Sequence, residues 1–265
     1  MSSATVITPR RSVIHPRFRA RRIEVKRDAG RRRLRRLVAL GVLVALLVIA
    51  YGVTRSPLLD LDHVRITGTA HTDPAAAIAA AGLRTGQPMT DVDIDRARRA
   101  IEALPWVDTV SITRHWPGTV AVAVTERRGV AALKLDEGTW LLLDPTGRVL
   151  ETRTTAPADL AVLTGVAATA GPGETVPEAL PGIALAGYIT ADLRAWFVEV
   201  VVNPDATLDA KLHNGIRVSF GSQAHLADKM IGLATVLTRV DLKDLDHVDL
   251  QVPNSPVLTR RGFSA

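Results

Sequence analysis

The chain has 265 residues, of which 47% are hydrophobic and 23% charged, a composition typical of a folded protein of one or two domains. It contains no cysteine, which excludes disulfide bonds and thiolate metal sites, so hydrophobic packing must hold its domains together. The net charge of +6 is unevenly distributed, because residues 1–36 hold 13 Lys and Arg against 2 Asp and Glu, whereas the remainder holds 20 against 25.

The first predicted element is a transmembrane helix from Leu37 to Thr54, an uncharged apolar run of 18 residues. Such a helix would be about 27 Å long, close to the ~30 Å hydrocarbon core of a bilayer, and it lacks the polar edge of a core helix. The 18 residues before it contain ten Lys or Arg and the 18 after it contain two, which predicts a cytoplasmic N-terminus and extracytoplasmic C-terminal domains. A cleaved signal peptide ending near Ala50 is the alternative, but the basic segment of 36 residues before the apolar run is longer than usual.

Residues 1–36 are rich in arginine and poor in apolar side chains, which predicts a disordered cytoplasmic tail. Next to a membrane span, attraction of this tail to anionic lipid is favoured over nucleic-acid binding, since among the arginines only Phe18 offers an aromatic ring for base stacking.

A first folded domain is predicted at residues 57–128. Its hydrophobic periodicity predicts, in order, a strand at 63–67, a helix at 74–81, a helix capped by Thr90 or Asp91, and strands around 109–113 and 120–126. The first helix is predicted to begin with the cap Thr72-Asp73-Pro74 and to end at Gly82. The second helix presents one apolar face, made of Ile94, Ala97, Ile101 and Leu104. The order of elements is therefore β-α-α-β-β.

A second, mostly β domain is predicted at residues 129–259, followed by a tail of residues 260–265. The run Asp144-Pro145-Thr146-Gly147 is typical of a type I turn and joins predicted strands at 139–143 and 148–151. A helix is predicted from about Gly182 to Leu193, before a strand at 196–202.

The pair Asn214-Gly215 would suit a two-residue hairpin turn, but that register sets apolar residues opposite polar ones. A three-residue loop from His213 to Gly215, with Gly215 in the left-handed conformation, instead places six apolar residues on one face. The predicted cross-strand pairs are Leu212 with Ile216, Ala210 with Val218 and Leu208 with Phe220.

The last predicted elements are a helix capped by Ser222 and a strand at residues 247–252. The buried stripe of this helix is predicted to be Leu226, Met230, Leu233, Leu237 and Val240. Because Pro253 stops the strand and no later strand is expected, this strand is predicted to lie at a sheet edge.

No arrangement of side chains points to catalysis, a cofactor or a metal. Asp91, Asp93 and Asp95 alternate like the opening of a calcium loop, but the required Gly and terminal Glu are missing, and acids suit the first turn of a helix. His213 and His225 have no paired carboxylates between them, and no serine lies in a nucleophile-elbow sequence.

Short motifs occurring in a fixed order resemble the FtsQ/DivIB family of bacterial division proteins over residues 31–259. In the first domain, which resembles a POTRA domain, these are HVRITG at 63–68, LPWV at 104–107, RHWP at 114–117 and VTER at 124–127. In the second domain they are LLLDPTGRV at 141–149, LTG at 163–165, FG at 220–221 and KM at 229–230, with Leu233. The predicted fold is thus α+β: a single N-terminal transmembrane helix, a β-α-α-β-β POTRA domain, and a mostly β C-terminal domain with a late helix and an edge strand. The high content of Ala, Val and Arg indicates a GC-rich, actinobacterial source.

The resemblance implies a non-enzymatic, membrane-anchored scaffold of the divisome at the septum. It implies binding of the division proteins FtsB and FtsL and, through them, of the septal cell-wall synthase. It places the docking surface at the last strand and the helix before it, where an extended partner segment would add a strand. The residues concerned are His247, Val248, Asp249, Leu250, Gln251, Val252, Leu258 and Thr259.

Three alternatives stay open. The last strand could be a plain core-facing edge without a partner. The chain could be another POTRA-bearing membrane protein of the secretion or outer-membrane-assembly type, which would need a C-terminal β-barrel. It could also be an anchored extracytoplasmic cell-wall enzyme, which would need a nucleophile or a metal site.

Overall fold

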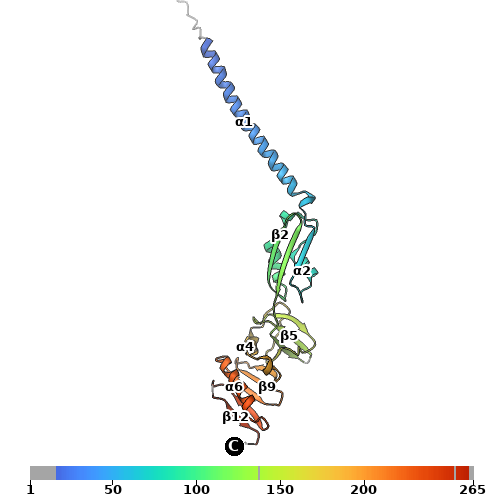
Figure 1. Cartoon of the computed structure of the whole chain (residues 1–265), viewed down its shortest axis with the longest axis vertical. Helices are drawn as coiled ribbons and strands as arrows, with labels where there is room; N and C mark the ends of the chain where they lie inside the picture. Colours follow the sequence, from blue (N-terminus) through green and yellow to red (C-terminus); the bar gives the residue numbers. More distant parts are fainter. Residues whose placement is uncertain (1–15, 137, 254, 263–265) are drawn as a thin grey trace, which may run out of the picture. The chain divides into compact units, whose positions relative to one another are not determined.

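The computed structural model of the chain describes residues 16–262, apart from residues 137 and 254, and divides into two units at residue 60 (Figure 1). The first unit contains the long helix α1 (Pro16–Thr54) and a short 3-10 turn, η1 (Pro57–Leu59). Within the described residues, one helix is long and apolar enough to cross a membrane: its stretch Arg33–Thr54 has a mean hydropathy of 2.6 and none of it is buried. This stretch contains the predicted span.

Helix α1 begins 21 residues before the predicted span, so residues 16–36 are helical where the sequence predicts disorder. Pro16 takes the first helical position, which suits its fixed φ. The Arg, Ala, Lys and Glu residues that follow are good helix formers, and they extend a helix that the apolar segment has already nucleated. The prediction of disorder for residues 1–15 falls outside the described residues.

The first module of the second unit, residues 61–127, follows the predicted β-α-α-β-β order. Its elements are β1 (His63–Thr67), α2 (Pro74–Ala81), the 3-10 turn η2 (Met89–Asp91), α3 (Ile94–Glu102), β2 (Val107–His115) and β3 (Thr119–Glu126). The sheet order is β1-β3-β2, with β1 parallel and β2 antiparallel to the central β3. One core joins the helices to the sheet through Ala77, Ala97, Ile101, Val110, Val120 and Val122.

The ends of the two helices show which polar residues act as caps. As predicted, Asp73 caps α2 by accepting from the amides of the first turn, and Gly82 ends that helix. Gly82 does so in the left-handed conformation. The predicted cap of α3 is wrong, because Asp93 is the N-cap and accepts from Arg96 N at 2.9 Å. The turn η2 uses residues 89–91, so the chain enters the helix two or three residues later than expected.

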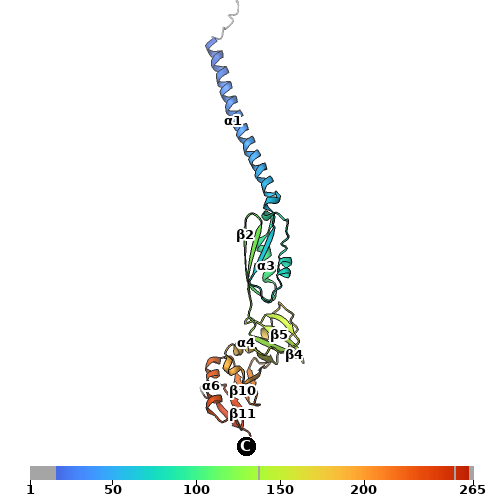
Figure 2. The ribbon, with the colours of Figure 1, turned by 45° about the vertical axis from the view of Figure 1, so that its right-hand side comes forward.

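The second module, residues 128–262, is built on a nine-stranded sheet (Figures 1 and 2). Its strands are β4 (Ala131–Asp136), β5 (Thr139–Leu143), β6 (Val149–Arg153), β7 (Ala161–Thr164), β8 (Phe197–Val202), β9 (Leu208–Leu212), β10 (Arg217–Gly221), β11 (Leu245–Asp249) and β12 (Val257–Arg260). The order across the sheet is β12-β11-β10-β9-β8-β7-β4-β5-β6. The turn between β5 and β6 forms as predicted, with Gly147 N donating to Asp144 O at 3.0 Å.

Helices cover one face of this sheet. They are η3 (Pro177–Ala179), α4 (Leu180–Ala186), α5 (Ala191–Arg194) and α6 (Leu226–Arg239). A single core joins α4 and α6 to the inward residues of the central strands, including Ile183, Val200, Leu208, Phe220, Leu233 and Val248. The predicted stripe of α6 is confirmed in this core, where four of its members are buried and Val240 packs against them.

The β9–β10 hairpin confirms most of the predicted register. Leu212 N donates to Ile216 O at 2.9 Å, Ala210 pairs with Val218, and Gly215 has a φ of +80°. The third predicted pair is wrong, because a bulge after Ser219 sets Leu208 opposite Gly221. The bulge leaves Phe220 facing the core, where it is fully buried.

The helix predicted at 182–193 is interrupted. It forms α4 and α5, separated by residues 187–190, because the chain turns to bury Ile189 in the core and Thr190 starts the next helix from an extended conformation. The predicted N-cap of α6 is also wrong, because His225 takes that position in a left-handed conformation. The buried ammonium of Lys229 donates to Phe220 O and Ser222 O, both at 2.8 Å, which holds the preceding loop away from a helical path.

Candidate functional site at the sheet edge and the module junction

The predicted docking strand lies one position inside the edge of the large sheet. His247, Val248 and Asp249 belong to β11, which pairs in parallel with β10 and in antiparallel with β12. Both sides of β11 are therefore hydrogen-bonded within the chain, so the expectation that this strand is the edge is wrong. The sequence missed β12 because only four residues form it, and they lie beyond two prolines that were expected to end the sheet.

The other predicted residues fall into three environments. Leu250 is 2% exposed and its amide donates to Ser219 O at 2.8 Å, so it belongs to the core. Gln251 and Val252 follow β11 and are exposed. Leu258 and Thr259 lie in β12, which places them on the edge strand itself.

Strand β12 has one side free for a further strand among the described residues. The amide of Arg261 donates to Asp244 O at 2.7 Å, which fixes the direction of the peptide groups in β12. Because these groups alternate along a strand, those of Val257 and Thr259 face β11, and those of Leu258 and Arg260 face away from it. Leu258 is half-buried against the core, whereas the other three side chains of the strand are exposed.

Charged side chains tie this edge to the strands behind it. Asp246 Oδ2 lies 3.0 Å from Arg217 Nη2 on β10, and Asp246 Oδ1 lies 3.4 Å from Arg261 Nε just after β12. The hydrogen bond from Arg217, helped by Arg261, lowers the pKa of Asp246 below its usual value. The carboxylate therefore stays charged at neutral pH and links three neighbouring strands at one end of the edge.

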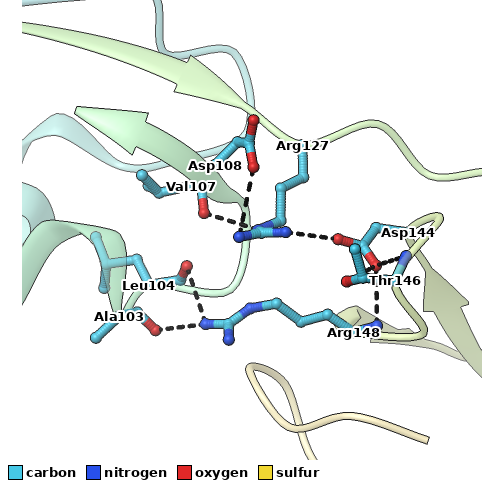
Figure 3. Close-up of polar contacts among 8 residues, drawn as sticks. All are labelled: Ala103, Leu104, Val107, Asp108, Arg127, Asp144, Thr146 and Arg148. Atoms are coloured by element: carbon cyan, nitrogen blue, oxygen red, sulfur yellow. Dashed lines mark hydrogen bonds and ion pairs between the residues drawn. The ribbon is translucent and has the colours of Figure 1, made fainter. Parts of the chain in front are cut away.

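The second notable polar cluster joins the two modules (Figure 3). Arg127, the residue after β3, donates from Nε to Val107 O at 2.9 Å and from Nη1 to Asp144 Oδ2 at 2.8 Å. Its Nη2 also lies 3.5 Å from Asp108 Oδ1. Arg127 thus connects the start of β2 in the first module to the β5–β6 turn in the second.

Asp144 is nearly inaccessible to solvent, with a side chain 2% exposed. Its Oδ1 accepts from Thr146 N at 2.8 Å, Thr146 Oγ1 at 2.7 Å and Arg148 N at 2.9 Å. Burial alone would raise the pKa of Asp144, but the hydrogen bonds from Thr146, Arg127 and Arg148 outweigh it and lower the pKa. The turn therefore holds a buried, fully bonded carboxylate that faces the first module.

Arg148 crosses the junction in the opposite direction (Figure 3). Its Nη2 donates to Ala103 O at 2.9 Å and to Leu104 O at 3.5 Å, just past the last residue of α3. A cation at this position satisfies carbonyls that have no partner within the helix and offsets the helix dipole. No spacing in the sequence singles out either arginine, although both lie in motifs that carry the family resemblance.

Comparison with known proteins gives one family match for each of the two modules. Residues 59–127 match the model of the POTRA domain, FtsQ-type, and residues 131–251 match that of the cell division protein FtsQ/DivIB, C-terminal. A cell division protein FtsQ of Corynebacterium glutamicum is 30% identical over 75% of this chain and 86% of the relative. The FtsQ of Streptomyces collinus is 30% identical over 87% of this chain and 90% of the relative.

A solved structure of the major extracytoplasmic domain of the division protein DivIB, trans isomer, from Geobacillus stearothermophilus is also similar in sequence. It is 25% identical and covers 44% of this chain and 98% of that one, with a TM-score of 0.31.

Proposed function

The chain belongs to the FtsQ/DivIB family of bacterial cell division proteins, and on this premise we propose that its second module binds the small division proteins FtsB and FtsL by adding a segment of one of them as a strand to β12. Members of this family are non-enzymatic, membrane-anchored components of the divisome. The first module is a POTRA domain, and α1 supplies the anchor. Because the family match covers both modules, the chain is neither a POTRA protein of the secretion type nor a cell-wall enzyme.

The orientation of the chain in the membrane is part of the proposal. The N-terminus lies in the cytoplasm and both modules lie outside the cell membrane, which the excess of Lys and Arg before the span supports. At the division septum the bound FtsB and FtsL then bring the septal cell-wall synthase to the same place.

The observation that carries the proposal is the free side of β12. An added strand would bond to the peptide groups of Leu258 and Arg260, which face away from β11. The exposed Val257 and the half-buried Leu258 offer apolar contacts on the two faces of the added strand. His247, Val248 and Asp249 were expected to bind the partner directly. In this proposal they instead pair with β12 and hold it in place.

The test removes one outward amide. Proline is tolerated in an edge strand where its missing N–H would face solvent, so Arg260→Pro should leave the fold intact while it removes a hydrogen bond to the partner. Arg260→Ala removes the same charge but keeps the amide, and is the matched control. The measurement is capture of the purified FtsB–FtsL pair by the detergent-solubilised full chain.

We expect Arg260→Pro to bind about tenfold or more weakly, since a partner carbonyl left buried without a donor costs about 1–3 kcal/mol. Arg260→Ala should bind within about threefold of the wild type, because exposed charges contribute little. If Arg260→Pro has the wild-type circular dichroism spectrum and still binds as tightly as Arg260→Ala, strand addition at β12 is wrong.

A further inference from the structure

Trp116 is an exposed aromatic side chain that lies outside the proposed docking edge at β12. It lies at the tip of the β2–β3 hairpin, within the RHWP motif, and is 55% exposed. Its neighbours His115 and Pro117 are exposed as well. The indole N–H forms no hydrogen bond within the described part of the chain. Within the described residues, both the apolar ring of Trp116 and its polar N–H therefore lack a partner.

The hairpin tip is fixed beside the residues where the chain enters the first module. Gly118 O accepts from Asp62 N at 2.8 Å and from His63 N at 3.0 Å. The parallel register of the sheet continues this contact by setting His63 opposite Thr119. The position of Trp116 is therefore tied to residue 62 by main-chain hydrogen bonds.

Residue 62 is close along the chain to the end of the membrane span. Eight peptide steps separate Asp62 from Thr54, the last residue of α1. Even fully extended, these steps reach at most about 28 Å, and the turn η1 shortens the path. The chain length therefore keeps the tip within reach of the membrane surface.

The chain carries other apolar groups along this short connection. Leu58, four residues before Asp62, is 78% exposed, the highest value among the exposed large hydrophobic residues of the described chain. Tyr51, three residues before the end of the span, is 66% exposed. Tyr and Trp are enriched where the hydrocarbon core meets the headgroups, because the ring is apolar and its O–H or N–H is polar.

We propose that Trp116 inserts at the headgroup level of the membrane that α1 spans, and that it fixes the first module to the bilayer surface at a second point. The partner is a lipid–water interface of ordinary phospholipid. Asp62 lies beside the tip through its bond to Gly118 O and Arg114 lies two residues before Trp116, so the nearby charges are of both signs and zwitterionic lipid suffices. The contact restricts how the module tilts on its tether.

The main test uses the full chain in nanodiscs of phosphatidylcholine brominated at shallow or deep acyl positions, with tryptophan emission as the readout. The chain has four tryptophans, so single Trp→Phe variants assign the quenched one. We expect bromolipid to quench part of the wild-type emission, more strongly with shallow bromines. Trp116→Phe should lose this quenched part, whereas Trp196→Phe, in the second module, should keep it.

A second measurement keeps Trp116 in place. Because the chain has no cysteine, His115→Cys can carry a unique nitroxide label, and Lys211→Cys, on the exposed side of β9, is the control. We expect the label at 115 to be reached by oxygen and shielded from a water-soluble nickel complex in nanodiscs, and the label at 211 to show the reverse. Equal behaviour of the two labels, or wild-type quenching retained by Trp116→Phe, would overturn the proposal. An absence of quenching in pure lipid would mean that Trp116 meets a protein instead, which also overturns it.

Discussion

Replacing Arg127 by Met should destabilise the folded unit, because it removes the ion-pair partner of a buried carboxylate. The Asp144 side chain is 2% exposed and that of Arg127 is 19% exposed, so solvent screens the pair only weakly. Losing a charged hydrogen bond of this kind costs about 1.5–3 kcal/mol, and losing the bond to Val107 O costs about 0.5–1.5 kcal/mol. The longer contact to Asp108, whose side chain is 49% exposed, contributes little.

These losses sum to about 3 kcal/mol, which lowers the melting temperature of a unit of this size by about 6–12 °C. The measurement is thermal and urea unfolding of the detergent-solubilised full chain, followed by circular dichroism. Arg128→Met is the matched control, since Arg128 is the next residue, is exposed, and has no hydrogen bond or ion pair in the described chain. Its free energy of unfolding should stay within about 0.5 kcal/mol of the wild type.

A double-mutant cycle with Asp144→Asn isolates the pair itself. Residues in direct contact couple, so Arg127→Met and Asp144→Asn together should cost about 1–3 kcal/mol less than the sum of the single changes. The hydrogen bonds at the junction lower the pKa of Asp144. The stabilisation by the Asp144 carboxylate is therefore full above the unfolded pKa of 3.8 and is lost as the pH falls through the folded pKa. Additive costs, or an Arg127→Met variant as stable as Arg128→Met, would refute the reasoning.

Two further predictions concern other charged side chains that bond to main-chain groups. Glu126 accepts main-chain amides of the β1–α2 loop, and although burial would raise its pKa, these bonds lower it from 4.5 to about 2. Its contribution should therefore be full above pH 4.5 and disappear as the pH falls toward 2, so that Glu126→Gln is less stable at pH 7 and the gap in melting temperature closes in acid. Lys229→Met should lower the free energy of unfolding by about 2–4 kcal/mol in urea, because it leaves the carbonyls of Phe220 and Ser222 without a donor. The control Lys211→Met, at an exposed position, should lower it by less than about 0.5 kcal/mol. Equal effects of the two changes would contradict the assignment.

The sequence predicted the elements whose signals are local. Helix α2 has a capping Asp at one end and Gly82 at the other, and both act as expected. The β9–β10 loop follows from pairing apolar residues on one face, a constraint strong enough to reject the more familiar two-residue turn. The predicted register is wrong only at Phe220, where a bulge turns the side chain into the core. The alternation of apolar and polar residues in the sequence does not indicate this bulge.

Contacts between distant parts of the chain left no such signal. Arg127 and Asp144 are 17 residues apart, and Arg148 reaches a carbonyl 45 residues before it. An arginine near a turn is usually a solvated side chain, and only the assembled fold shows which carboxylate or helix end it meets. The cap of α3 was ambiguous for a related reason, since Asp91 and Asp93 both precede the helix and the turn η2 takes up Asp91.

The edge strand shows why the end of a sheet is hard to locate from sequence, and also why it suits binding. Of the four residues in β12 only Leu258 is half-buried, so the strand has no alternation of its own and forms because β11 offers it hydrogen bonds. A partner can add to β12 only when β12 is itself ordered. If β12 became ordered only on binding, the free-energy cost of that ordering would weaken the affinity. The carboxylate of Asp246 holds the end of β12 to β10 through Arg217 and Arg261, so this ordering is already complete in the free protein.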